Sequence, residues 1–364
     1  MISIPLFLKF TEIGRDKNLM EKKIKTAPEM FSENGLFADL KAYEKYFEKS
    51  LSHRQSLLSF WNYLYAKYIG ISPVDRVILG KNRWLFLKRL NESGSEIDYS
   101  ISVEKFKNGE LRYWFRLFNE RYRFLKKRGI HLLLVIVPNK STIYTEHLPE
   151  RIKRVTAGTR ADQITKYFRN HSDIPVLNLR ELLLSKKKER RVYHRTDSHW
   201  TFFGAWLGYR EIIKHFSKYY NGVEAKRFED FPKKIIKGPS MADLASMLTL
   251  QNSLYSEKLE RIFFPRGLKP KKIHLKNFKY KKIRKSYFRN NNGVLPKTLM
   301  IHDSFGLVMK KYMASTCSEI IFLLDWGFNF FPQLIEREKP SIVIYEIAER
   351  FFYRPAKHLP QNRK

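Results

Sequence analysis

The segment from His131 to Val137, HLLLVIV, is almost entirely apolar and branched, and Pro138 ends it. Such a run is typical of a central strand in a parallel sheet, where helices cover both faces. Strand-like and helix-like segments alternate along much of the chain, with helices expected over 102–127, 161–171 and 333–337, and strands over 175–179, 298–301, 320–324 and 341–345. This alternation predicts an α/β protein, a flavodoxin-like three-layer α/β/α domain with a parallel sheet.

Ser304 occupies the turn between the apolar strand 298–301 and a helix that is expected to begin at Phe305. A serine at this position is exposed at the carboxyl end of the strand. The backbone N–H groups at the start of the following helix, at Phe305 and Gly306, are then placed to hold a developing oxyanion. Acyl transfer needs this arrangement.

Asp197 and His199 lie two residues apart in the segment TDSHW, a spacing that favours a loop. Thr201 is a suitable N-cap, and the apolar spacing after it predicts a helix that begins just beyond the pair. Serine is a poor nucleophile unless a neutral imidazole takes its proton and a carboxylate orients that imidazole. Ser304, His199 and Asp197 supply one group of each kind. The alternative is that Asp197 caps a helix and His199 is a packed core histidine.

Several motifs resemble the SGNH-hydrolase-like domain of the alginate O-acetyltransferases AlgX and AlgJ. The matching segments follow the order of that family along nearly the whole chain: NRWLF at 82–86, VPNKSTIY at 137–144, TDSHW at 196–200, DLASML at 243–248, HDSFG at 302–306 and KPSIVIYEIAERF from Lys339. The resemblance implies an SGNH-hydrolase-like fold in which the Asp and His block precedes the Ser block, the reverse of ordinary SGNH esterases. It also implies Ser304 as nucleophile, His199 as general base and acid, and Asp197 as the orienting group.

Further residues are candidates for a substrate pocket. Asn139 and Lys140 follow the strand that ends at Val137, and open α/β sheets place their ligands at this edge. A turn-forming Asn is the alternative. Trp200 completes the TDSHW segment, whereas Trp84 is expected to be a core anchor rather than a sugar platform. Three charged residues just past the last expected strand are interpreted as structural pairing: Glu346, Glu349 and Arg350.

The formal net charge is +34, and the densest basic stretch is Arg261 to Asn290, with twelve Lys or Arg and no Asp or Glu. Such a field attracts any polyanion, so the stretch is either a solvated face or a surface for anionic polymer; no specific nucleic-acid partner is expected. The single cysteine, Cys317, is expected to be a buried small residue. The sequence has no zinc-ligand pattern, P-loop or dinucleotide fingerprint, and no metal or cofactor is expected.

We expect an N-terminal segment with helices over 1–75, a catalytic domain over 76–355, and a basic insertion over 222–295. Two amphipathic helices broken near His53 are expected between residues 37 and 68. The apolar stretch Met1 to Phe10 is too short to cross a bilayer and lacks the features of a signal peptide. We interpret it as the remnant of a membrane anchor. The resemblance implies a location in the periplasm or on the periplasmic face of the inner membrane.

The function that follows is O-acetylation of a cell-envelope polysaccharide through an acyl-serine intermediate. The resemblance implies two partners, the polysaccharide acceptor and a membrane-bound O-acyltransferase that supplies the acetyl group. An SGNH-type carbohydrate esterase is the alternative within the same chemistry, because water would then replace the sugar hydroxyl. A non-catalytic module that binds polysaccharide or membrane is the alternative from another class.

Overall fold

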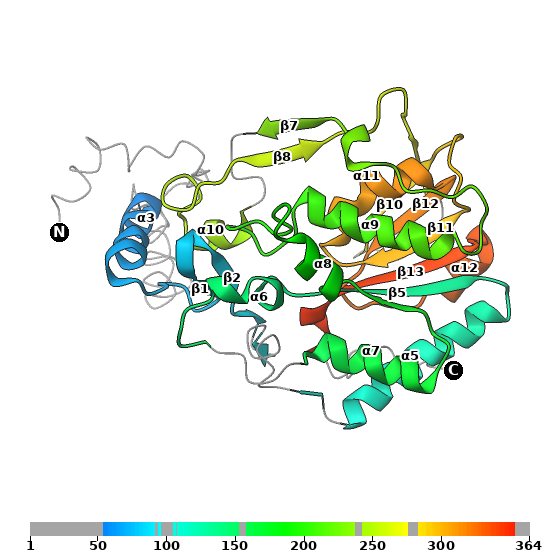
Figure 1. Ribbon diagram of the computed structural model, residues 1–364, viewed down its shortest axis with the longest axis horizontal. Helices are drawn as coiled ribbons and strands as arrows, with labels where there is room; N and C mark the ends of the chain where they lie inside the picture. Colours follow the sequence, from blue (N-terminus) through cyan, green and yellow to red (C-terminus); the bar gives the residue numbers. More distant parts are fainter. Residues whose placement is uncertain are drawn as a thin grey trace, which may run out of the picture.

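A seven-stranded sheet forms the centre of the molecule, with the strand order β6-β5-β13-β11-β12-β10-β9 (Figure 1). The computed structural model describes residues 54–91, 94–95, 105–106, 108–152, 158–236, 242–275 and 283–353. The strands of the sheet are β5 (His131–Val137), β6 (Val176–Asn178), β9 (Lys271–Ile273), β10 (Arg284–Arg289), β11 (Thr298–His302), β12 (Glu319–Leu324) and β13 (Ile342–Ala348).

The strands β6, β5, β13, β11 and β12 run parallel to their neighbours, whereas β10 and β9 add an antiparallel edge. The strand predicted at His131–Val137 is confirmed, and it lies between β6 and β13. Every residue of β13 is buried, as expected for a strand covered on both faces. The sheet is therefore mostly parallel.

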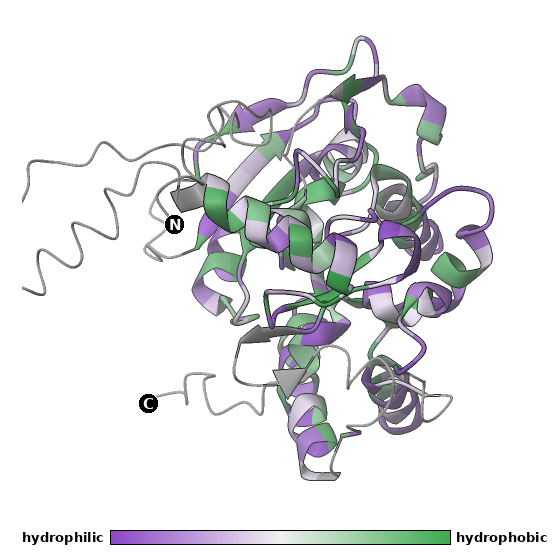
Figure 2. Cartoon of the chain, turned by 90° about the vertical axis from the view of Figure 1, so that its left-hand side faces the viewer, coloured by the Kyte–Doolittle hydropathy of each residue, from purple (hydrophilic) through white to green (hydrophobic). Residues whose placement is uncertain are grey.

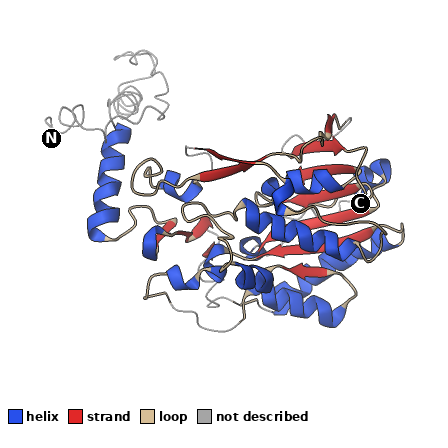
Figure 3. Cartoon of the chain, turned by 45° about the horizontal axis from the view of Figure 1, so that its top comes forward, coloured by secondary structure: helices blue, strands red, loops and turns tan. Residues whose placement is uncertain are grey.

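Helices cover both faces of this sheet (Figure 3). They are α5 (Asn108–Lys126), α7 (Arg160–His171), α8 (Arg180–Lys186), α9 (Phe202–Phe216), α11 (Gly306–Thr316) and α12 (Pro332–Glu338). Helix α11 connects β11 to β12, and α12 connects β12 back to β13, so the two crossovers run in opposite directions along the sheet. Because such crossovers are right-handed, α11 and α12 lie on opposite faces. Helix α9 packs on α11, and α5 packs on α7. The predicted three-layer α/β/α fold is confirmed.

Smaller elements surround this sandwich. Three two-stranded sheets are formed by β1 (Val77–Leu79) with β2 (Leu85–Leu87), β3 (Arg89–Asn91) with β4 (Gly94–Ser95), and β7 (Lys233–Ile236) with β8 (Leu259–Ile262). Helix α3 (Arg54–Leu64) precedes them, and the short helices α6 (Lys140–Ile143) and α10 (Asp243–Met247) lie in the connections. Of the two predicted N-terminal helices, the second corresponds to α3, while 37–53 lie outside the described residues.

The main core lies between the sheet and its helices, and Leu134 and Ile344 on adjacent central strands are fully buried within it. A second apolar cluster joins β1 and β2 to α10, with Leu85 and Leu244 fully buried. Figure 2 shows that the helices carry both hydrophobic and hydrophilic residues, as expected for helices with one buried and one solvent-facing side. Cys317 is buried, as predicted. In the described part of the chain, no helix has both the length and the apolar character needed to cross a bilayer.

Two details differ from the sequence-based expectations. Glu346 was expected just past the last strand, but β13 continues to Ala348, so Glu346 lies inside the strand. The segment 222–295 was expected to be an insertion, yet β9 and β10 within it extend the central sheet through pairing of β10 with β12. Apolar side chains at Tyr287 and Phe288 let this otherwise basic segment pack on the core.

Candidate active site

Ser304 lies on the turn between β11 and α11, at the carboxyl edge of the parallel strands. The turn is tight: a Cβ atom at position 306 would lie 2.5 Å from the His302 Cβ, so only glycine fits there. Asp303 stabilises the turn and ties it to the end of β13, because its carboxylate accepts hydrogen bonds from the Phe305 N–H (2.8 Å) and the Ala348 N–H (2.7 Å). Ser304 itself is only partly buried.

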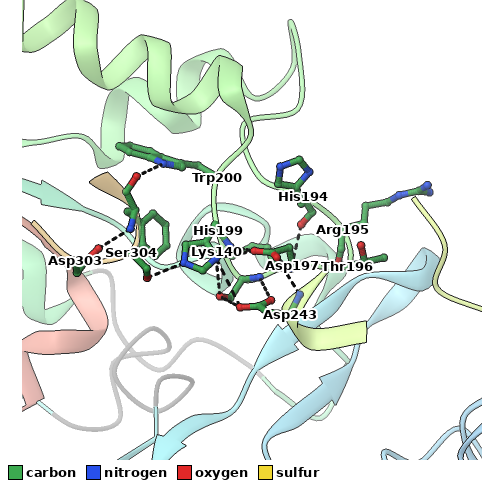
Figure 4. A network of polar contacts seen from close by, with 12 residues as sticks. Lys140, His194, Arg195, Thr196, Asp197, His199, Trp200, Asp243, Asp303 and Ser304 are labelled. Atoms are coloured by element: carbon green, nitrogen blue, oxygen red, sulfur yellow. Dashed lines mark hydrogen bonds and ion pairs between the residues drawn. The ribbon is translucent and has the colours of Figure 1, made fainter. Parts of the chain in front are cut away.

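His199 joins Ser304 to Asp197 (Figure 4). Its Nδ1 lies 2.7 Å from Asp197 Oδ1, and its Nε2 lies 2.7 Å from Ser304 Oγ. An ionised carboxylate can only accept, so Nδ1 carries the proton and Nε2 is free to accept the hydrogen of the Ser304 hydroxyl. The sequence predicts that these three residues act together although His199 and Ser304 are 105 positions apart, and the structure brings them into one hydrogen-bonded series.

Asp197 is held in place by backbone donors as well as by the imidazole. The His199 N–H donates to Oδ1 (2.8 Å), and the Asp243 N–H donates to Oδ2 (2.9 Å). Burial by itself raises the pKa of Asp197, but the hydrogen bond and charge of His199 and the donor from Asp243 outweigh it and hold the pKa well below its usual value. Asp197 is therefore ionised and oriented towards the imidazole.

Lys140 supports the loop that carries Asp197. Its side chain is buried, and Nζ donates to three backbone carbonyls, those of His194 (3.1 Å), Arg195 (3.2 Å) and Asp197 (2.7 Å). An ammonium group has three donors, so this set uses all of them. The sequence placed Lys140 near a substrate pocket; the structure instead places it beneath the loop.

Two carboxylates that were not among the candidates also bind this loop. Asp243, at the start of α10, accepts from the Ser198 N–H (2.7 Å) and the Ser198 hydroxyl (2.5 Å), and Oδ2 lies 3.7 Å from His199 Nδ1. Glu257 accepts from the Thr196 N–H (3.2 Å) and hydroxyl (2.9 Å). The signal for Asp243 was its position in DLASML, an acid directly before a short apolar helix; Glu257 had no comparable signal.

The two expected oxyanion donors are turned inward. The Phe305 N–H donates to Asp303, and the Gly306 N–H lies close enough to the Glu346 carboxyl to lower its pKa. Other effects outweigh it, because burial and then the Asp303 carboxylate raise the pKa of Glu346 well above its usual value. Among the described residues, the Ser304 N–H has no hydrogen-bond acceptor.

The remaining pocket candidates are buried and bonded within the fold. The Asn139 side-chain oxygen accepts from the Arg350 N–H (3.1 Å), and Glu349 accepts from the Asn139 N–H (3.1 Å), which ties the end of β5 to the turn after β13. Trp200 donates from Nε1 to the Phe305 carbonyl (3.1 Å), so it links the His199 loop to the Ser304 turn. Trp84 is only 3% exposed, in agreement with a core anchor.

Asp197, His199 and Asp243 are also the described residues whose grouping is compact enough to hold a cation, with one ligand atom of each within 4.8 Å of the others. Each of the two carboxylates already accepts hydrogen bonds from the loop. His199 uses both ring nitrogens in contacts with Asp197 and Ser304. We therefore interpret the three side chains as parts of the hydrogen-bonded series rather than as ligands of a cation.

A mostly parallel sheet covered by helices, with a serine on a strand-to-helix turn and an aspartate-oriented histidine against it, defines a protein of the SGNH-hydrolase-like class. The chain belongs to the family described as SGNH hydrolase-like domain, acetyltransferase AlgX, whose model matches residues 77–262. That match contains Asp197, His199 and Asp243 and ends before Ser304.

Individual relatives agree with this family. "Probable alginate O-acetylase AlgJ" of Pseudomonas fluorescens is 27% identical over 175 residues, which cover 48% of this chain and 41% of that protein. The chain thus aligns with about two fifths of the length of that relative. Among solved structures, Bacillus cereus PatB1 has a TM-score of 0.53 at 16% identity and covers 74% of this chain and 95% of that one. The O-acetyltransferase domain of Pseudomonas putida AlgJ has a TM-score of 0.51 at 20% identity and covers 78% and 94%.

Proposed function

We propose that this protein is an O-acyltransferase that acetylates a hydroxyl group of a cell-envelope polysaccharide. The observation that carries the proposal is the pair of 2.7 Å contacts that His199 makes with Asp197 and Ser304. This geometry lets one imidazole take the proton of the serine while the carboxylate fixes its tautomer. Relatives named as alginate O-acetylases support a polysaccharide as acceptor.

The reaction has two balanced steps. Ser304 Oγ attacks the acetyl carbonyl of the donor while its proton passes to His199 Nε2, and the leaving group departs with that proton as the acetyl-serine ester forms. A sugar hydroxyl then attacks the ester carbonyl, His199 takes its proton and returns it to Ser304 Oγ, and the acetylated sugar is released. We assign the Ser304 N–H as a donor to the oxyanion of both steps, because its hydrogen is not engaged elsewhere in the described residues.

The proposal extends to the domain organisation, the acetyl donor and the location of the protein. We propose that residues 76–355 form the catalytic domain, with 222–295 as a basic segment that also contributes to the sheet, and that 1–75 form an N-terminal segment. The acetyl donor is a membrane-bound O-acyltransferase, and acetyl transfer takes place in the periplasm or on the periplasmic face of the inner membrane. The donor and the location are proposed from the similarity of the chain to the AlgX family and to relatives named as alginate O-acetylases.

Acyl-enzyme formation tests the proposal directly. Wild-type protein mixed with an activated acetyl ester should gain the mass of one acetyl group, and Ser304→Ala should gain none. Ser185→Ala, which changes an exposed hydroxyl on α8, is the matched control and should be acetylated as the wild type is. Acetylation of Ser304→Ala at the wild-type rate would overturn the nucleophile assignment.

The fate of the acetyl group distinguishes transfer from hydrolysis. With an oligosaccharide acceptor present, the acetyl group should appear on the sugar faster than acetate appears in solution. Release of acetate alone, at a rate that the acceptor does not change, would favour the esterase. A protein that binds polysaccharide but never forms an acyl-enzyme would be the non-catalytic module.

A further inference from the structure

A cavity of about 810 Å³ lies beside the His199 loop, on the side of the loop that carries Arg195. Four cations line it, Lys187, Lys188, Arg191 and Arg195, against a single lining carboxylate, Glu146. A concave site with one sign of charge raises the local concentration of the oppositely charged ligand. The lining therefore favours anions.

Part of this positive charge is already neutralised. Lys187 pairs with Glu146 (2.9 Å), and Arg191 pairs with Glu257 (2.5 Å). In the part of the chain that the structure describes, neither Lys188 nor the Arg195 guanidinium has an ion pair or side-chain hydrogen bond. Arg195 Nε is buried without an acceptor. Arg195 as a whole is only partly buried and lines the cavity, so the exposed part of its guanidinium is placed to receive an anionic group.

Aromatic rings form another part of the wall. The His147 ring lies almost parallel to the Trp84 ring, with centroids 4.6 Å apart and 10° between the planes. Tyr144 also packs against Trp84, with ring centroids 4.2 Å apart. Trp84 and Tyr144 are almost fully buried and support His147, which is only partly buried. These rings therefore give the cavity an aromatic wall beside its charged side chains.

The cavity shares backbone with the candidate active site. The Arg195 carbonyl accepts from Lys140 Nζ and from the Leu85 N–H (2.9 Å), and Asp197 follows two residues later. Figure 4 shows the Arg195 side chain extending away from Ser304, at the opposite end of the same network. A single ligand that contacts both the cavity and the serine must therefore cross the loop. A polymer is long enough to do so, whereas a small acyl donor is not.

We propose that this cavity is an anion-binding subsite for an acidic glycan, in which the Arg195 guanidinium engages a carboxylate or phosphate group of the polymer. The proposal rests on the proposed function, since it assigns the charge of the acceptor. Arginine suits this role because its planar fork matches both oxyanion groups with paired hydrogen bonds. Lys188 adds an exposed point charge at the same wall.

Titration of the full chain tests the proposal in a Ser304→Ala background, where acyl transfer cannot consume the ligand. The probes are a short oligogalacturonate, its carboxyl-reduced neutral counterpart, and a phosphate-bearing oligosaccharide of similar length. We expect the two charged probes to bind more tightly than the neutral one, with affinities that fall as salt is raised. The stronger of the two charged probes identifies which oxyanion group the cavity takes.

Arg195→Ala should weaken binding of the preferred charged probe by about tenfold or more, because a charge-assisted hydrogen bond is lost. Arg195→Lys should retain part of the affinity, and Lys188→Glu, at an exposed position, should weaken binding without affecting folding. Lys214→Ala is the control, since it removes a cation that lies outside the cavity and whose side chain is 73% exposed. Its affinity should match that of the parent.

The proposal is overturned if the neutral probe binds as tightly as the charged ones. It is also overturned if Arg195→Ala and Lys188→Glu, both folded as judged by thermal melting, bind the charged probes as the Lys214→Ala control does. These outcomes are independent of turnover. Failure of the wild type to form an acyl-enzyme would count against the proposed function and leave the binding result readable.

Discussion

Replacing Asp243 by Asn measures how much a second carboxylate assists the imidazole. Its nearer oxygen lies 3.7 Å from His199 Nδ1. Two unit charges at this separation attract by about 1 kcal/mol in water and by about 4 kcal/mol at an effective dielectric constant of about 20. The Asp243 side chain is 31% exposed and that of His199 is 18% exposed, so solvent screens the pair in part. We expect a loss of about 1–2 kcal/mol in the imidazolium-forming step, which lowers kcat/KM about 5- to 30-fold.

The variant keeps most of the local geometry. Its backbone N–H still donates to Asp197, and its amide oxygen can still accept from the Ser198 N–H. The assay is hydrolysis of p-nitrophenyl acetate, with the free energy of unfolding measured in parallel. Asp230→Asn is the matched control, because that side chain is also 31% exposed but pairs with Arg227.

Two results would refute the reasoning. A rate for Asp243→Asn that equals the rate of the Asp230→Asn control would show that the second charge does not act on the imidazole. A loss as large as that of Asp197→Asn would show that the two carboxylates are equivalent, contrary to the direct contact that Asp197 alone makes with the ring.

Three further changes have defined outcomes. Asp197→Asn should lower kcat/KM by about 10³-fold or more but leave residual activity, because the imidazole survives while its preferred tautomer is lost; complete inactivity in a folded variant would contradict this. Burial lowers the pKa of His302 to about 3, so the wild type should lose stability relative to His302→Gln by up to about 1.4 kcal/mol per pH unit as the pH falls from about 6.5 towards 3, as measured by urea unfolding. Burial raises the pKa of Glu346, so the sign is opposite: the wild type should lose stability relative to Glu346→Gln as the pH rises above about 4.5, and a pH-independent difference would show that this carboxyl does not titrate differently in the two states.

Local sequence was sufficient for the parallel strands of the central sheet and for the proximity of Asp197, His199 and Ser304, but not for β9 and β10. The strand at His131–Val137 is readable because cover on both faces demands an unbroken apolar run. Ser304 is readable because a small polar residue between an apolar strand and a helix must lie on the connecting turn. Thr201 was predicted as an N-cap, and its hydroxyl does accept from the Gly204 N–H (3.2 Å).

The supporting contacts could not be derived in the same way. Lys140 follows a strand end, as a pocket residue would, but its role depends on three carbonyls of a loop more than fifty positions away. Phe305 opens a helix, as an oxyanion donor would, yet Asp303 captures its N–H locally. Asp243 belongs to a different segment from its partners, and only tertiary folding places it against Ser198. The contacts of Lys140 and Asp243 depend on long-range geometry that residue spacing does not encode, whereas the contact of Asp303 with Phe305 is local.

The position of β13 has a consequence for biosynthesis. It is the last described strand in sequence, yet it pairs with β5 on one side and β11 on the other. On the ribosome, the part-sheets β5–β6 and β11–β12 are therefore made first, and each keeps an apolar edge with unpaired backbone groups until residues 342–348 emerge. Premature termination upstream of residue 342 would leave Asp197, His199 and Ser304 in the chain but release two half-sheets that cannot close. Such products should aggregate or require chaperones rather than retain partial activity.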